Sequence, residues 1–154
     1  MKRALVALDI SDISYSIIRF VFPFARRHKI FHLDFIHVRE EEPENMLTQE
    51  GYPENMQSGE KTGRYRILED MISNVLDSIT VEETSFNLII KTGDILEEIL
   101  LRSSEICYEF IILGKSRKSD LDTLFEGSLQ NSLIMESPCP LLIFAPRKEK
   151  WFIT

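Results

Sequence analysis

The chain has 154 residues, a formal net charge of −7 and 44% apolar side chains, which suits one domain with a complete hydrophobic core. An acidic chain is not expected to bind nucleic acid, because neutralising phosphates requires a basic surface. No apolar run approaches the ~20 residues of a membrane span, and Asp9 interrupts the apolar start too early for a signal peptide. We therefore expect a soluble cytoplasmic protein without nucleic-acid or membrane partners.

Apolar and amphipathic segments alternate from the start of the chain. Residues 4–8 form a short apolar run typical of a strand buried on both faces. Ser11 or Asp12 can cap a following helix with apolar residues at helical spacing, and residues 26–29 put positive charge at its C-terminal end. Residues 31–38 are predicted to form the second strand.

Residues 40–63 interrupt this alternation. The segment is acidic, contains two prolines and has little periodicity, which predicts a flexible loop with at most a helical turn inside it. Its composition does not distinguish a binding lid from a simple connection.

The alternation then resumes to the end of the chain. The predicted elements are a helix with an apolar stripe over 67–79, a strand over 86–91, a helix capped by Asp94, a strand over 108–113, a helix opened by Gly127-Ser128 and a strand over 141–144. Helices between buried strands predict a single-domain α/β fold, a doubly wound five-stranded parallel sheet with helices on both faces. Ligands of such sheets bind beyond the carboxyl ends of the strands, where Asp9 and Gly114 stand.

Neither the histidines nor the cysteines indicate a metal site. His32 and His37 are five apart on a predicted strand and therefore face opposite sides. Cys107 and Cys139 lie beside apolar residues and outside any Cys-x-x-Cys motif, which indicates reduced thiols.

The stretch "GKSRKSDLDTLFEGS" at 114–128 carries the clearest chemical signal. A glycine after a strand permits positive φ and lets backbone N–H groups approach a ligand, and a helix start at Gly127-Ser128 favours phosphate. Residues 115–119 add cations and hydroxyls in an otherwise acidic chain. A strand exit, a solvated basic turn and an ordinary helix cap would explain the same residues, so both interpretations stay open at this point.

The order of elements, the start "ALVALDISD", the "HV" that closes the second strand, and "GKSRKSDLDTLFEGS" followed by "SPCPLLIF" resemble the universal stress protein family. ATP-binding members carry Gly, two residues, Gly, nine residues, then Gly-Ser or Gly-Thr. Gly114 and Gly127-Ser128 match this spacing, but Arg117 occupies the position of the middle glycine. The resemblance implies a single Rossmann-like, adenine nucleotide alpha hydrolase-like domain over 1–154, with 40–63 and 147–154 outside the similar region.

The resemblance also implies a nucleotide site. Asp9 would lie near the ribose, and the backbone at Ala7 and Val38 near the adenine. The residues that would surround the phosphates are Gly114, Ser116, Arg117, Gly127, Ser128, Leu129 and Gln130. Arg117 would either donate hydrogen bonds to phosphate or obstruct the loop.

The implied function is binding of ATP or a related adenine nucleotide, with or without Mg²⁺, in a stress response that depends on binding and not on turnover. No catalytic residue is predicted, because Ser128 has no apparent base partner, so ATP hydrolysis would be slow at most. The alternative is an interaction protein of the same fold that lost the site because of Arg117. The apolar last strand, Leu141 to Phe144, is expected at a sheet edge, where many family members form homodimers.

Overall fold

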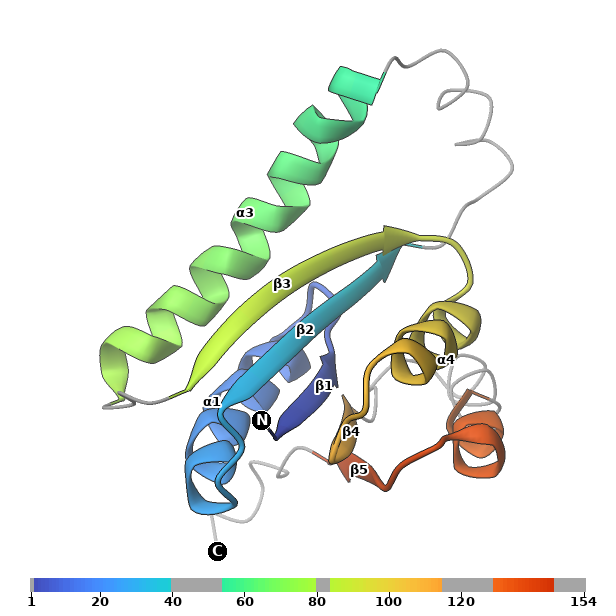
Figure 1. Ribbon diagram of the computed structural model, residues 1–154. Coiled ribbons are helices and arrows are strands. Elements are labelled where there is room, and N and C mark those ends of the chain that lie inside the picture. Colours follow the sequence, from blue (N-terminus) through green and yellow to red (C-terminus); the bar gives the residue numbers. More distant parts are fainter. Residues whose placement is uncertain (1, 40–53, 80–83, 115–128, 146–154) are drawn as a thin grey trace, which may run out of the picture.

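A computed structural model describes residues 2–39, 54–79, 84–114 and 129–145 of the chain (Figure 1). Its five strands form one parallel sheet in the order β3-β2-β1-β4-β5. The strands are β1 (Arg3–Ala7), β2 (His32–Arg39), β3 (Ser85–Thr92), β4 (Phe110–Gly114) and β5 (Leu141–Phe144). The predicted α/β fold with a five-stranded parallel sheet is confirmed.

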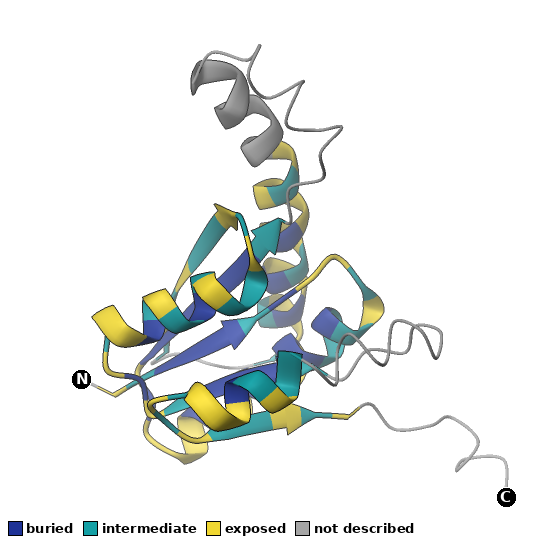
Figure 2. Ribbon diagram, turned by 90° about the vertical axis from the view of Figure 1, so that its right-hand side faces the viewer, coloured by how far each residue is buried: buried dark blue, intermediate teal, exposed yellow. Residues whose placement is uncertain are grey.

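Helices cover both faces of the sheet. The helices are α1 (Asp12–Arg27), α3 (Glu54–Ser78) and α4 (Ile95–Glu105), and residues 129–136 are also helical. Side chains of β1 alternate between two apolar clusters, because successive residues of a strand point to opposite faces. Ala4 and Val6 belong to the cluster that includes residues of α1 and α3, whereas Leu5 packs with Ile99 and Leu133 on the other face. Figure 2 shows these buried central strands between half-exposed helices.

The helix starts follow from capping, although by different means. The Asp94 side chain accepts a hydrogen bond of 2.9 Å from the backbone N–H of Glu97, which confirms the predicted cap of α4. Ser11 occupies the N-cap position of α1 but its side chain makes no capping bond, and its hydroxyl donates to the Asp9 carboxylate instead. The C-terminal end of α1 carries Arg26 and Arg27, which complement the helix dipole.

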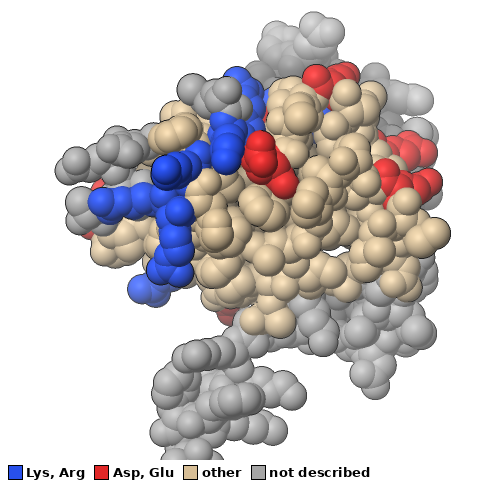
Figure 3. Space-filling model, turned by 60° about the horizontal axis from the view of Figure 1, so that its bottom comes forward, with Lys and Arg blue, Asp and Glu red and all other residues tan. Residues whose placement is uncertain are grey.

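Lys and Arg side chains gather on one side of the molecular face seen in Figure 3.

Helix α3 begins at Glu54, so the structure differs from the predicted loop over 54–63. These residues are polar and have no apolar stripe, which is why their sequence did not predict a helix. Farther along the helix, Leu68, Ile72 and Val75 are fully buried against the sheet. Helix growth is cooperative, and a packed segment can extend into neighbouring polar turns at little cost. Residues 40–53 lie outside the described residues.

Helices of the described ranges are all too short or too polar to cross a lipid bilayer.

Candidate functional site

A cavity opens where the strand order reverses. Strand β1 pairs with β2 on one side and with β4 on the other. The chain runs outward from β1 to β2 and β3, and then returns past β1 to β4 on its other side. A crevice at the carboxyl ends of the strands is the usual ligand site of this topology. A cavity of about 220 Å³ lies there. It is lined by Ala7, Leu8, Asp9, Ile13, Ser14, Ile17, Ile95, Ile99, Leu113, Gly114, Leu129 and Gln130.

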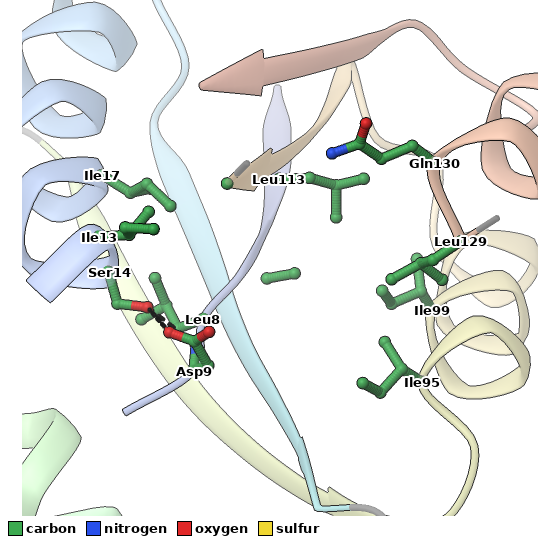
Figure 4. Close-up of a pocket in the computed structure, with 12 residues that line it drawn as sticks. Leu8, Asp9, Ile13, Ser14, Ile17, Ile95, Ile99, Leu113, Leu129 and Gln130 are labelled. Atoms are coloured by element: carbon green, nitrogen blue, oxygen red, sulfur yellow. Dashed lines mark hydrogen bonds between the residues drawn. The ribbon is translucent and has the colours of Figure 1, made fainter. Parts of the chain in front are cut away.

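Two apolar walls face each other across this cavity (Figure 4). Ile13 and Ile17 of α1 form one wall, and Ile95 and Ile99 of α4 lie on the opposite side. Asp9, Ser14 and Gln130 supply the polar side chains. Mostly apolar walls with a few convergent polar groups are typical of small-molecule sites.

Asp9 is held in place by the first turn of α1. Its Oδ1 accepts a hydrogen bond of 2.9 Å from the Ser14 hydroxyl, and its backbone N–H donates to the Ser14 Oγ over 2.8 Å. Ser11 donates a further hydrogen bond to Oδ1. These contacts fix the carboxylate at the edge of the cavity, and within the described part of the chain they engage Oδ1 and leave Oδ2 without a hydrogen bond.

Gly114 is needed for space. A Cβ atom at this position would lie 2.6 Å from Ile17 Cδ1 and 2.9 Å from Ile13 Cγ2. We predicted a turn with positive φ at Gly114. Among the described glycines, the one with a positive φ is instead Gly93, where φ is 146°. The glycine at the end of β4 therefore lets α1 approach the strand, and α1 in turn forms one wall of the cavity.

His37 braces the end of β1 from the neighbouring strand. Its Nδ1–H donates to the Leu8 carbonyl over 2.9 Å, and its Nε2 accepts from the Arg64 guanidinium of α3 over 3.0 Å. These two bonds require the neutral imidazole. Burial lowers the pKa of His37, the hydrogen bond to Leu8 opposes this, and the charge of Arg64 lowers it further. Because Leu8 lines the cavity, α3 and β2 together hold one side of it.

The structure brings together five of the ten predicted site residues. Ala7, Asp9, Gly114, Leu129 and Gln130 all line the cavity. Val38 is not among the lining residues and packs instead with the apolar cluster on the α4 face. The remaining four, Ser116, Arg117, Gly127 and Ser128, lie outside the described residues.

Sequence reasoning missed most of the apolar lining. Ile13 and Ile17, like Ile95 and Ile99, are four residues apart at the start of a helix that follows a strand. This spacing puts both members of each pair on one helix face, which a core-facing stripe also requires. Ser14 had a weaker signal, since its role depends on the position of Asp9.

Both α1 and α4 begin at the cavity, because Ile13 and Ile95 of their first turns line it. Unpaired backbone N–H groups and the helix dipole favour negative charge at such ends. Gly114 and Leu129, the described residues on either side of 115–128, also line the cavity. The two residues that flank the basic segment 115–128 are therefore both at this site.

A parallel sheet with a crevice at its switch point defines a doubly wound α/β protein. The family model described as the universal stress protein family matches residues 1–145, and the chain belongs to this family. No curated protein sequence matches the chain.

Solved structures show the same fold at low sequence identity. Universal stress protein UspA from Lactobacillus plantarum is 16% identical, with a TM-score of 0.70 and coverage of 93% of this chain and 97% of that one. A universal stress protein in complex with cAMP is 15% identical, with a TM-score of 0.63 and coverage of 94% and 96%. The universal stress protein from Archaeoglobus fulgidus in complex with dAMP is 15% identical, with a TM-score of 0.58 and coverage of 93% and 97%.

The Gly114→Ala substitution tests whether this glycine provides space. The new methyl group should push Ile13 and Ile17 toward the cavity and lower the free energy of unfolding by about 1–3 kcal/mol. Urea unfolding measures this change. Gly63→Ala in α3 is a matched control, because nothing lies within 4 Å of its added Cβ, and it should stabilise the helix by roughly 0.5–1 kcal/mol. Equal stability of the two variants would contradict the packing role.

The His37→Asn substitution tests the neutral imidazole. Because the pKa of His37 is lowered in the folded protein, the unfolded chain binds this proton more readily. Its contribution to stability is therefore present above about pH 6.5 and is lost as the pH falls further, through the folded pKa. The asparagine amide can still donate to Leu8 but does not titrate in this range. Wild type should lose more stability than the variant between about pH 7.5 and about pH 5.5, and parallel curves from urea unfolding would refute this.

Proposed function

We propose that this chain binds ATP or a related adenine nucleotide in the cavity between β1 and β4, and acts in stress adaptation through nucleotide-dependent binding. The observation that carries this proposal is the position of Gly114 and Leu129. Both line the cavity, and the segment between them holds Gly127, hydroxyls and cations that, together with Gly114, resemble a phosphate-binding motif.

The residues of the cavity fit the parts of a nucleotide. Opposed isoleucines of α1 and α4 suit the flat faces of a base, and the Asp9 carboxylate can accept hydrogen bonds from ribose hydroxyls. The start of α1 favours the negative charge of phosphates. The volume of about 220 Å³ is below the ~300–1,000 Å³ of whole ligand pockets, so it suits part of a nucleotide.

Residues beyond the described ranges would complete the site. Ser116 and Ser128 offer hydroxyl groups, Gly127 allows close approach of the backbone, and Arg117 offers a guanidinium group for charge-assisted hydrogen bonds to phosphate. Val38 would contact adenine only through its backbone. Mg²⁺ would arrive mainly on the phosphates, since it usually keeps waters and takes one or two carboxylates, here Asp9.

Two related structures support an adenine nucleotide as the ligand class, because their bound molecules are cAMP and dAMP. We further propose binding without turnover. Among the described lining residues, the carboxylate of Asp9 is the group that could act as a general base, and Ser11 and Ser14 donate hydrogen bonds to its Oδ1. The competing function is an interaction protein in which Arg117 blocks the site. Mass spectrometry of small molecules released from freshly purified, denatured protein separates these two functions, and phosphate release over many turnovers detects a hydrolase.

The two possible roles of Arg117 predict opposite changes in ATP affinity. If its guanidinium contacts phosphate, Arg117→Ala should weaken the binding of ATP by about 1.5–3 kcal/mol. The affinity for adenosine should stay unchanged, because adenosine carries no charge. If arginine obstructs the site, the same variant should bind ATP more tightly. Calorimetric titration of both ligands measures the difference. Equal losses for ATP and adenosine would contradict both roles.

The last strand supports a second proposal, a homodimer that pairs through β5. This strand lies at the sheet edge, and unpaired edge groups favour pairing with another copy. Ile143 is 37% exposed, and the Phe144 ring lies 5.4 Å from that of Phe20, itself 36% exposed. These side chains would extend the backbone ladder with apolar contacts.

The dimer is tested by light scattering across a dilution series. Wild type should have twice the chain mass at high micromolar concentration, and Ile143→Glu should shift it toward monomer, because the charge would have to be buried between the copies. Leu101→Glu is the control, since Leu101 is 54% exposed on α4. A monomeric wild type, or equal effects of the two variants, would overturn the proposal.

A further inference from the structure

Four polar residues share one face at the other end of the sheet. His32 and Asp34 are two residues apart on β2 and therefore point to the same side. In the register of β2 with β3, Ser85 pairs with His32 and Asn87 pairs with Asp34. The four side chains occupy the corners of a small patch at the start of these strands, away from the cavity.

Three of these side chains form a continuous hydrogen-bonded chain. The Ser85 hydroxyl lies 2.7 Å from His32 Nδ1, and His32 Nε2 lies 2.9 Å from Asp34 Oδ1. The same hydroxyl also lies 3.2 Å from the Phe31 carbonyl oxygen, so its one proton can go to the nearer imidazole or to this carbonyl. Burial increases along this chain, from an exposed serine to a histidine that is 8% exposed and a carboxylate that is 0% exposed. A hydroxyl within reach of an imidazole that a third group orients is the arrangement of an activated nucleophile.

The surroundings of Asp34 set the tautomer of His32. Tyr108 donates its hydroxyl proton to Oδ2 over 2.5 Å, and Arg102 Nη2 lies 3.3 Å from the same oxygen. Burial raises the pKa of Asp34, but hydrogen bonds from Tyr108, His32 and Arg102 outweigh it and lower the pKa below its usual value. An ionised carboxylate can only accept, so Oδ1 accepts a hydrogen bond from Nε2–H, and in the neutral imidazole the Nδ1 lone pair then faces Ser85.

Asn87 offers a donor beside the serine. Its position is exposed and two residues beyond Ser85, about 6.6 Å along the strand on the same face. Within the described ranges its side-chain amide makes no hydrogen bond with another residue. An uncommitted amide at this distance can turn toward negative charge that develops next to the serine.

We propose that Ser85 is a nucleophile that accepts acyl groups from small activated carboxylic esters, with His32 as general base, Asp34 as its orienting carboxylate and Asn87 as oxyanion donor. The substrate class follows from the site's position. Ser85 is exposed on an edge strand, so a small ester can approach from solvent. This proposal is independent of nucleotide binding, because its residues lie at the opposite ends of the strands.

The chemical step balances without a cofactor. The Ser85 Oγ attacks the ester carbonyl while its proton moves to His32 Nδ1, and Asn87 donates to the oxyanion of the tetrahedral intermediate. Collapse of this intermediate breaks the bond from the carbonyl carbon to the leaving oxygen. The imidazolium then returns its proton to the leaving alcohol, and an acyl-serine remains until water, activated by the same imidazole, releases the acid.

The experiment uses the full chain and p-nitrophenyl acetate. Release of p-nitrophenolate gives the rate, and peptide mass spectrometry locates the acetyl group. Acetylation at Ser85 should exceed that at Ser104 by at least about tenfold, since a positioned base contributes roughly 10²–10⁴-fold. Ser104 is the matched reference, because it is exposed and its hydroxyl, like that of Ser85, has a backbone carbonyl as a partner, but within the described residues it has no contact with a histidine. Ser85→Ala should remove the fast phase, whereas Ser104→Ala should leave it unchanged.

Two further variants separate chemistry from structure. His32→Gln should lower the acetylation rate at Ser85 by about tenfold or more and abolish its rise with pH, since glutamine cannot take a proton. Asn87→Ala changes an exposed side chain, so it should fold normally and slow the reaction about tenfold through loss of the oxyanion donor. Acetylation of Ser85 no faster than that of Ser104, or an unchanged rate in folded Asn87→Ala and His32→Gln, would overturn the proposal.

Discussion

The pairing of β1 on both of its edges is the constraint on which the rest of the structure depends. A strand with a neighbour on each side and helices over both faces has no solvated surface, which is why residues 4–6 are all fully buried. The same pairing sends successive connections in opposite directions. The cavity follows from this reversal, since α1 and α4 diverge from the carboxyl ends of the strands and line it from opposite sides.

Packing around this strand explains why α1 is both a structural and a site element. Its Ile17 reaches the end of β4 because Gly114 has no side chain, and Ser14 binds the Asp9 backbone and carboxylate. Core packing and ligand geometry are therefore not separable on this helix. On the other side of β1, His37 also links core and cavity, because it hydrogen-bonds both to the Leu8 carbonyl and to Arg64 of α3.

The sequence allowed the fold to be predicted, because each buried strand is a short apolar run and Asp94 caps a helix in the usual way. It also located the crevice, since Asp9 comes two residues after β1 and Gly114 ends β4, the two strands that flank it. It did not reveal why Gly114 is glycine, because the clash involves residues about a hundred positions earlier in the chain. The extension of α3 to Glu54 depends on packing of its distant half, and the polar patch on β2 is hidden within an apolar run. Asp34 lies 68 positions from Arg102 and 74 positions from Tyr108, so no local sequence pattern predicts these contacts.

Strand β2 carries a histidine near each end, and the two rings serve different partners. His32 faces the α4 side with Asp34, whereas His37 binds Leu8 and Arg64. Five residues of extended chain separate them by about 16 Å, beyond the range at which substitutions usually interact. The two ends of the sheet are therefore energetically independent modules on one scaffold. Selection could alter the proposed chemistry at one end, or lose it, without disturbing the proposed ligand binding at the other.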